Sequence, residues 1–141
     1  MCHKTVFCGA VPTALLLKLA INLFGNSVVV CLAEALHFAR EHGLDLEQFV
    51  DVIDAGPLAS TLARVKARKL VDGDFAVQAS AANVLANTRL IAEAAREARL
   101  AAPVLEVCEL LYGETVARGH GDDDMVAVIH ALEARTAVAG R

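Results

Sequence analysis

The sequence has no tryptophan, one tyrosine and only three prolines among its 141 residues. Aromatic residues make up 4% of the chain, whereas apolar residues make up 56%. That apolar share exceeds the roughly 45–50% of typical soluble domains, so the composition excludes a disordered chain. The core must be built from alanine, leucine and valine, which lose little conformational freedom in a helix. The length and even composition predict one domain, rich in helices.

The chain also has no excess of basic over acidic residues. The chain carries 13 lysines and arginines against 17 aspartates and glutamates, for a formal net charge of −4. Proteins that bind nucleic acid concentrate positive charge on one face, because each contacted phosphate needs a cation. We therefore expect no nucleic-acid partner.

The cysteines form no recognisable pattern. Cys2, Cys8, Cys31 and Cys108 are scattered, and none belongs to a Cys-x-x-Cys pair. This usage excludes a disulfide scaffold and predicts free, buried thiols in a reducing cytoplasm. Cys2-His3 with Cys8 lacks a second ligand pair, so we expect no metal. The polar N-terminus does not resemble a signal peptide, and a cytoplasmic location is predicted.

One long apolar run, Val11 to Ala33, is long enough to cross a bilayer. Lys18 within it would cost roughly 2.5–3.5 kcal/mol near the bilayer centre, and Asn22 and Asn26 would add to that cost. We therefore expect no membrane span. A helix that is apolar nearly all round is then either the central rod of a bundle or the seam of an oligomer.

Capping and stop residues divide the rest of the chain into helices. Asp45 and Ser60 are suited to begin helices, whereas Gly43, Gly56 and Gly73 are suited to end them. The β-branched and apolar stretch from Lys4 to Gly9 is typical of a short strand before the first helix, and no period-2 alternation follows residue 10. The predicted helices span residues 12–42, 45–56, 60–71, 77–99 and 103–118, with a last one from Asp122 or Asp124 to 136. The predicted fold is all-α, a helical bundle around one long central helix.

The most informative polar residues lie on the first helix. Lys18, Asn22 and Asn26 are four residues apart, which forms one polar stripe about 80° wide. A buried lysine needs a partner, so we expect the stripe to face a cleft or another protein. Alternatively, Lys18 reaches solvent while the asparagines bind nearby backbone. In the functional interpretation, the ammonium polarises a substrate oxygen and the amide orients both groups.

Other polar clusters have simpler interpretations. His37 and His42 are five residues apart, which places them on different helix faces and argues against a zinc pair. The acidic run Asp122–Asp124 beside His120 could suggest a metal, but carboxylates at a helix start are sufficient to explain it.

The basic cluster Arg64, Lys66, Arg68 and Lys69 is interpreted as a solvated helix face. A contact to a phosphate or a substrate carboxylate is the alternative. Glu34 is either a buried partner of a basic residue or a point at which the helix reaches the surface.

Several motifs, in order along residues 5–132, resemble the C-terminal helical domain of the β-hydroxyacid dehydrogenases. This family includes 3-hydroxyisobutyrate dehydrogenase and relatives of 6-phosphogluconate dehydrogenase. The matching residues are Gly9, Lys18-Leu-Ala-Ile-Asn22, Ala33-Glu34-Ala35, Gly43-Leu44-Asp45, Asp72-Gly73-Asp74-Phe75, Arg89-Leu90, Ala94-Ala95, Pro103, Tyr112 and Gly119 to Asp124.

The resemblance implies that the two domains of such an enzyme have different functions. In such enzymes a Rossmann domain binds NAD or NADP, and the helical domain supplies a catalytic lysine and forms a homodimer. Lys18 would be the general acid/base and Asn22 would orient the substrate, a small 3-hydroxy acid that exchanges hydride with the nicotinamide. Residues 1–10 would be the remnant of a Rossmann domain, and residues 11–141 the substrate and dimerisation domain.

The chain also departs from the family pattern. It has no Gly-x-Gly-x-x-Gly after a strand, and Pro12-Thr13-Ala14 replaces the glycine-rich segment that usually precedes the lysine. Ala86-Asn87 stands where members commonly have Lys-Asp, whose lysine helps on the cofactor side. We therefore expect no turnover by this chain alone, and no cofactor-binding residue can be named. The alternative is a non-catalytic helical dimerisation or binding module; an imine-reductase-like relative is disfavoured because that group does not usually keep the lysine.

The apolar first helix also carries an expectation of its own. The chain should be dimeric, with residues 23–36 largely buried at or near the seam. Sedimentation at micromolar concentration checks this, and a single monomeric species would contradict it.

Overall fold

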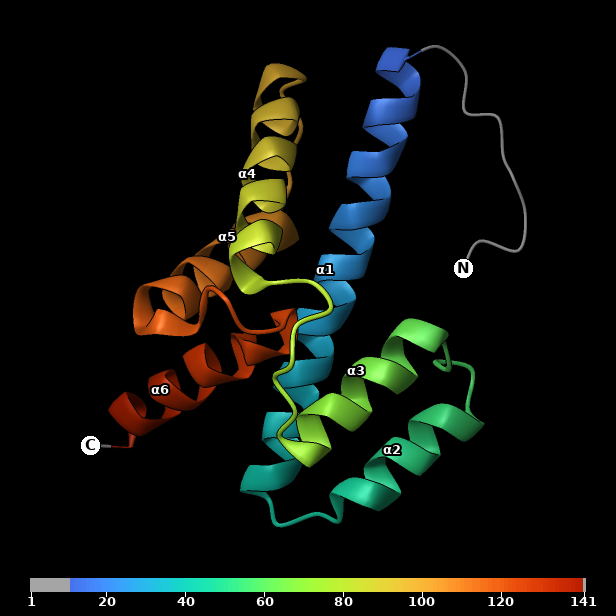
Figure 1. The fold of residues 1–141 in the computed structure, drawn as a ribbon, viewed down its shortest axis with the longest axis vertical. Helices are drawn as coiled ribbons and strands as arrows, with labels where there is room; N and C mark the ends of the chain where they lie inside the picture. Colours follow the sequence, from blue (N-terminus) through green and yellow to red (C-terminus); the bar gives the residue numbers. More distant parts are fainter. Residues whose placement is uncertain (1–10, 141) are drawn as a thin grey trace.

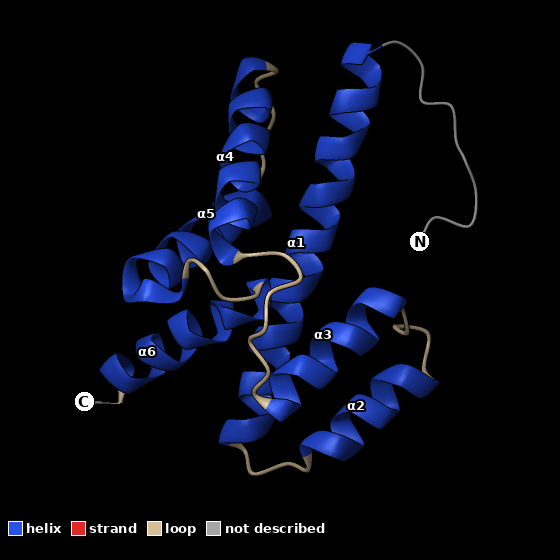
Figure 2. Cartoon of the chain, viewed as in Figure 1, coloured by secondary structure: helices blue, strands red, loops and turns tan. Residues whose placement is uncertain are grey.

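The computed structural model describes residues 11–140, in which the chain is helical and forms no strand (Figures 1 and 2). This confirms the all-α class. The predicted strand before residue 10 lies outside the described residues. The elements are α1 (Val11–Glu41), α2 (Leu46–Ala55), α3 (Thr61–Asp72), α4 (Ala81–Glu97), α5 (Pro103–Thr115), a π turn (Val116–His120), a 3₁₀ turn (Met125–Val128) and α6 (Ile129–Ala139).

Helix α1 is the axis of the domain, as predicted, but the other helices surround mainly its C-terminal half (Figure 1). Val29, Ala33 and Leu36 on that half are completely buried in the main core. The N-terminal half packs on one side only, where Leu19 and Leu23 contact a small second cluster of α4 and α5 residues. The long helix is therefore a buried rod over about half its length and a largely exposed one over the rest.

Most helix boundaries follow local chemistry, and these predictions are confirmed. Asp45 Oδ1 accepts the backbone N–H groups of Glu47 and Gln48 at 2.9 and 3.2 Å, which begins α2. Ser60 Oγ accepts the N–H of Ala63 at 3.0 Å, which begins α3. Gly43 after α1 and Gly73 after α3 have φ angles of 68° and 64°, a conformation that glycine adopts without a Cβ penalty.

The prediction for the fourth helix was wrong at its start. Residues 74–80 form an irregular connection, and α4 begins at Ala81, after Ser80 has accepted the N–H of Asn83. The backbone of this connection bonds to the chain before α6 instead of to itself. Asp124 N–H donates to Phe75 O at 3.0 Å, and Met125 N–H donates to Ala79 O at 2.7 Å. These long-range bonds replace the predicted first turn of the helix.

The last third of the chain is less regular than predicted. After α5 the chain continues through the π turn, whose Gly119 has a φ of 93°. Asp124 then caps the 3₁₀ turn by accepting the N–H of Val126 at 3.2 Å, and α6 follows directly. The predicted single helix is thus a 3₁₀ turn joined to an α-helix.

Tyr112, at the centre of the core, offers a test of the packing. Its side chain is completely buried, and its hydroxyl has no hydrogen-bond partner among the described residues. Burial raises the pKa of Tyr112 well above its usual value, so the group stays a neutral phenol. Because an unpaired buried hydroxyl costs about 1–3 kcal/mol, we expect Tyr112→Phe to raise the free energy of unfolding by about 1 kcal/mol. Urea denaturation measures this, and a loss of stability would show that the hydroxyl has a partner.

Candidate functional site

The polar stripe of α1 faces α4. Asn22 Nδ2 donates to Asn87 Oδ1 at 3.2 Å, and one turn later Asn26 Nδ2 donates to Thr88 Oγ1 at 3.4 Å. Asn87 in turn donates to Asn83 O at 3.3 Å. The asparagines therefore bind side chains of a neighbouring helix and not nearby backbone. This ladder fixes the facing surfaces of α1 and α4 against each other.

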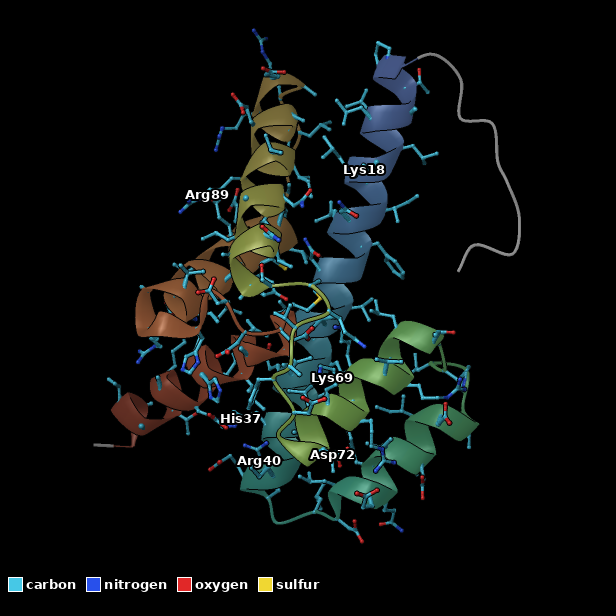
Figure 3. All side chains as sticks on the ribbon, viewed as in Figure 1. Lys18, His37, Arg40, Lys69, Asp72 and Arg89 are labelled. Carbon is cyan, nitrogen blue, oxygen red and sulfur yellow. The ribbon has the colours of Figure 1, made fainter. Side chains whose placement is uncertain are left out.

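Lys18 lies one turn before Asn22 on the same face of α1, and its side chain is exposed (Figure 3). Within residues 11–140 no ion pair or hydrogen bond engages its ammonium. The lysine of the stripe therefore needs no buried partner, because water surrounds it. Its ammonium and the amide oxygen of Asn22, whose Nδ2 is engaged by Asn87, are the groups that this face offers to a ligand.

Asn87 is the site residue whose role the sequence did not reveal. It belongs to the Ala86-Asn87 pair that was noted only as a departure from the family pattern. Ala86 is exposed, whereas Asn87 is half-buried and holds the Asn22 amide. The departure from the family pattern had drawn attention to position 87. Only the packing of α1 on α4 shows what the Asn87 side chain contacts.

The prediction that the basic cluster is a solvated face was wrong for both lysines. Lys66 and Lys69 are 4% and 7% exposed. Lys66 Nζ donates to both carboxylate oxygens of Asp124, at 2.9 and 3.0 Å, and to Gln78 Oε1 at 3.1 Å. Lys69 Nζ donates to Asp74 Oδ2 at 2.9 Å and to the backbone carbonyl of Ala76 in the same connection at 2.7 Å. Both lysines anchor the 74–80 connection to α3.

The two arginines of that cluster are exposed, as predicted, but each has an internal partner. Arg64 pairs with Asp54 at 2.7 Å and Arg68 with Glu47 at 2.6 Å. The hydrogen bond from Arg64 lowers the pKa of Asp54. Since every cation of the cluster is paired with a carboxylate of this chain, the geometry favours a structural role over a phosphate contact.

The four histidines of the described part of the chain also have contacts within the domain. His37 Nε2 lies 2.8 Å from Thr136 Oγ1, and His42 Nδ1 lies 2.8 Å from its own helix backbone, which confirms that they occupy different faces. His120 and His130 stack with ring centroids 4.3 Å apart, a pairing not evident in the sequence. Within the described residues no group of three or more histidines, cysteines and acidic residues could hold a metal.

The structure also shows which of the remaining candidate residues are buried. Asp124 is completely buried, so it is not only a helix-start carboxylate. Glu34 is exposed, which shows that the helix reaches the surface there. Cys108 is buried, and burial raises the pKa of its thiol, but Cys31 is exposed. The prediction that the thiols are buried was therefore wrong for Cys31, and Cys2 and Cys8 lie outside the described residues.

By length and composition alone, α1 could cross a membrane from Pro12 to Glu41. Its asparagines are bonded to α4, and its C-terminal half is packed in the core of the domain. These contacts are typical of a helix that is part of a globular bundle.

Comparison with known proteins identifies the family. Residues 13–132 match the family described as "NAD-binding of NADP-dependent 3-hydroxyisobutyrate dehydrogenase". The chain belongs to this family. Its fold is similar to that of 3-hydroxyisobutyrate dehydrogenase from Mycobacterium tuberculosis, solved with L-serine, with a TM-score of 0.79, 25% identity, and coverage of 92% of this chain and 46% of that one. The Salmonella typhimurium 3-hydroxyisobutyrate dehydrogenase shares the fold at a TM-score of 0.78 and 23% identity, over 81% of this chain and 40% of that one.

Two kinds of curated relative are similar in sequence. Cytokine-like nuclear factor N-PAC of Drosophila pseudoobscura pseudoobscura is 26% identical over 132 residues, which cover 90% of this chain and 22% of that protein. The chloroplastic glyoxylate/succinic semialdehyde reductase 2 of Arabidopsis thaliana is 23% identical over 128 residues, covering 91% and 36%. The chain thus spans between about a fifth and less than half of the relatives that it matches.

Proposed function

We propose that residues 11–141 are the substrate-side and dimerisation domain of an NAD(P)-dependent β-hydroxyacid dehydrogenase, inactive without its Rossmann domain. Membership of the family and its fold support the class of reaction, hydride transfer between a nicotinamide and a 3-hydroxy acid. The observation that carries the proposal is the Lys18–Asn22 pair, which stands on one face of α1 with Asn22 held by Asn87.

In this proposal each residue of the pair has a role. Lys18 binds the hydroxyl or carbonyl oxygen of the substrate and transfers the proton that accompanies oxidation or reduction. Asn22 accepts a hydrogen bond through its Oδ1 and orients the substrate beside the ammonium. Asn87 keeps the Asn22 amide in one orientation, so that little ordering is required when the substrate binds.

In this proposal the described residues serve mainly the substrate end of the reaction, and the NAD binding named in the family description requires a Rossmann domain as well. Between residues 11 and 140 there is no strand leading to a glycine-rich loop, and Ala86 offers no cation to a phosphate. NAD or NADP would be held mainly by a Rossmann domain, which would present the nicotinamide as hydride donor or acceptor. No cofactor step is assigned to residues of this chain.

The proposal includes the setting in which the domain works. We place it in the cytoplasm as a homodimer with a Rossmann domain beside Lys18, without a nucleic-acid or membrane partner. The acidic balance of the chain and the internal pairing of its basic cluster support the absence of nucleic acid. The bonding of Asn22 and Asn26 to α4 supports a soluble bundle.

A second candidate function is a non-catalytic dimerisation or binding module with the same fold. Ala86, where the family commonly has lysine, favours it, as does the similarity to nuclear factors whose names describe no oxidoreductase. The intact Lys18 and Asn22 favour the first candidate.

Calorimetric titration with NADH and NADPH separates the two candidates. The chain is titrated alone and then together with a separately expressed Rossmann domain of a family member, which is also titrated alone as the control. A half-enzyme should change the cofactor affinity of the Rossmann domain when it is added, while binding no cofactor alone. If the Rossmann domain binds NADH and NADPH with the same affinity whether or not the chain is present, the non-catalytic module is favoured.

A further inference from the structure

The bond from Asn22 to α4 determines which end of the Asn22 amide is free. Asn87 uses its own Nδ2 to donate to Asn83 O, so the atom that it presents to α1 is its Oδ1. Only the Nδ2 of Asn22 can bond to that oxygen, at 3.2 Å. A backbone carbonyl of α4 therefore leaves the amide oxygen of Asn22, an acceptor, as the free end.

Thr88 imposes the same orientation on Asn26. Its hydroxyl has one proton, which it donates to Val84 O at 2.8 Å, so Thr88 Oγ1 accepts from Asn26 Nδ2 at 3.4 Å. Within residues 11–140 no donor bonds to the amide oxygen of Asn26, and this oxygen is not among the side-chain atoms that are buried without a partner. Asn26 therefore offers a second acceptor that the domain itself does not use.

The surface beside the two oxygens is not filled by α1. Gly25 lies three residues after Asn22 and directly before Asn26, and it has no side chain. Among the described residues, a Cβ at Gly25 would have one contact outside its own helix, Leu62 Cδ2 of α3 at 3.9 Å. In order along the helix, this face carries the ammonium of Lys18 and two acceptor oxygens that start one turn, about 6 Å, apart.

We propose that Asn26 is a specificity-determining residue that selects substrates with a second hydroxyl group. This rests on the proposed function and names the class of 3-hydroxy acid on which the domain acts, a dihydroxy acid. The reacting hydroxyl lies beside Lys18 and Asn22, and the second hydroxyl donates to Asn26 Oδ1. Thr88 is the positioning residue, because it turns the acceptor end of the Asn26 amide towards the substrate.

The chemistry of the free oxygen excludes other groups from this position. An amide oxygen accepts hydrogen bonds and cannot donate, so a methyl group gives it nothing and a carboxylate places acceptor against acceptor. A hydroxyl lies about 2.7 Å from the oxygen to which it donates. Two hydroxyls that reach Asn22 and Asn26 can therefore stand on neighbouring carbons or a few bonds apart.

A matched pair of acids tests the second hydroxyl. 3-Hydroxybutanoate and 3,4-dihydroxybutanoate have the same carbon chain and carboxylate, and they differ only in the hydroxyl on the terminal carbon. The isotope-labelled chain, assembled with a Rossmann domain, is titrated with each acid without cofactor, and NMR follows the asparagine side-chain amides. We expect the dihydroxy acid to bind about five- to tenfold more tightly, the gain from one neutral hydrogen bond. It alone should shift the amide signal of Asn26.

Substitutions at position 88 test the orientation of Asn26. In Thr88→Val the Asn26 amide loses its partner and can turn either end outwards, so the preference should fall to about twofold or less. Thr88→Ser keeps the hydroxyl and should keep the preference. Thr115→Val is the matched control, because Thr115 is also completely buried and donates to a carbonyl of its own helix, that of Leu111, at 2.8 Å. It bonds to no asparagine, so its removal should leave the preference unchanged.

Circular dichroism confirms that each variant is helical. If Thr88→Val does not fold, Asn26→Ala replaces it, since it removes the acceptor itself at a half-buried position and should also abolish the preference. Equal affinities of the two acids for the wild type, or failure of both to bind, would overturn the proposal. A preference that survives in Thr88→Val and in Asn26→Ala would do the same.

The proposed function is tested separately by turnover of 3-hydroxybutanoate in the assembled domains with cofactor. Turnover together with equal affinities for the two acids would leave the dehydrogenase in place and overturn only the role of Asn26. A preference for the dihydroxy acid without turnover of either acid would support the role of Asn26 in binding and contradict the proposed reaction.

Discussion

Asp124→Asn is expected to lower the free energy of unfolding by about 3–5 kcal/mol, because it leaves a buried ammonium without its counter-charge. Asp124 is completely buried and accepts two hydrogen bonds from Lys66. The same carboxylate accepts the backbone N–H groups of Gln78, Ala79 and Val126 at 2.9, 3.2 and 3.2 Å. An asparagine side chain keeps one of the two acceptor oxygens. Its amide NH₂ group takes the place of the other oxygen and would face the N–H groups that this oxygen accepts.

Urea denaturation of the two proteins measures the loss. Asp123→Asn is the matched control, because Asp123 is adjacent in sequence and partly exposed, and its side chain bonds only to His120 among the described residues, at 2.7 Å. Its loss should be within about 1 kcal/mol, the range of exposed pairs. Equal losses in both variants would contradict the dominant role of the buried pair.

The Asp124 carboxylate should also make the free energy of unfolding depend on pH, in a direction that its pKa shift determines. Burial acts to raise the pKa of Asp124, but the hydrogen bonds from Gln78, Lys66, Val126 and Ala79 outweigh it and hold the pKa below its usual value. A depressed pKa contributes stability above the pKa of the unfolded chain, and that stability is lost as the pH falls through the folded pKa. The unfolding free energy should therefore fall more steeply in acid for the wild type than for Asp124→Asn.

Lys18→Ala is expected to reduce turnover by about 10²–10⁴-fold when the chain is assembled with a Rossmann domain, the range over which a general acid/base contributes. Lys18 is exposed, so the substitution removes a functional group without disturbing the core. The variant should keep the fold and the effect of the chain on cofactor affinity. Steady-state assays with 3-hydroxy acids and calorimetry measure the two properties.

Arg96→Ala is the matched control for Lys18→Ala. Arg96 is also an exposed cation, and it lies near the C-terminal end of α4. Its removal should leave turnover unchanged. Turnover by Lys18→Ala equal to that of the wild type would show that the lysine is not the acid/base and would favour the non-catalytic module.

The sequence predicted those parts of the fold that depend on neighbouring residues. Asp45 and Ser60 begin helices by bonding to residues two or three positions later, so their role can be inferred from spacing. The start of α4 could not be inferred in this way. The backbone carbonyls of Phe75 and Ala79 accept the N–H groups of residues 124 and 125 instead of forming helix hydrogen bonds. No pattern in the neighbouring sequence indicates such distant partners.

The same distinction applies to the candidate site. The spacing of Lys18, Asn22 and Asn26 was sufficient to predict one polar face, but not the bond from Asn22 to Asn87, which depends on how two helices pack. The basic cluster was misinterpreted because its pattern is that of a surface helix, whereas Lys66 finds its carboxylate 58 residues later. Cys31 was expected to be buried because it lies in an apolar run, but that run has a second face that the domain leaves uncovered.

The bond between Lys66 and Asp124 also constrains when this domain can fold during its synthesis. A nascent chain that has emerged from the ribosome only as far as Gly121 contains α1 to α5 but not the carboxylate that Lys66 requires. Its 74–80 connection also has no partner for the backbone of Phe75 and Ala79. The first five helices therefore lack the carboxylate and the backbone partners that complete the core until the residues after Gly121 have also emerged.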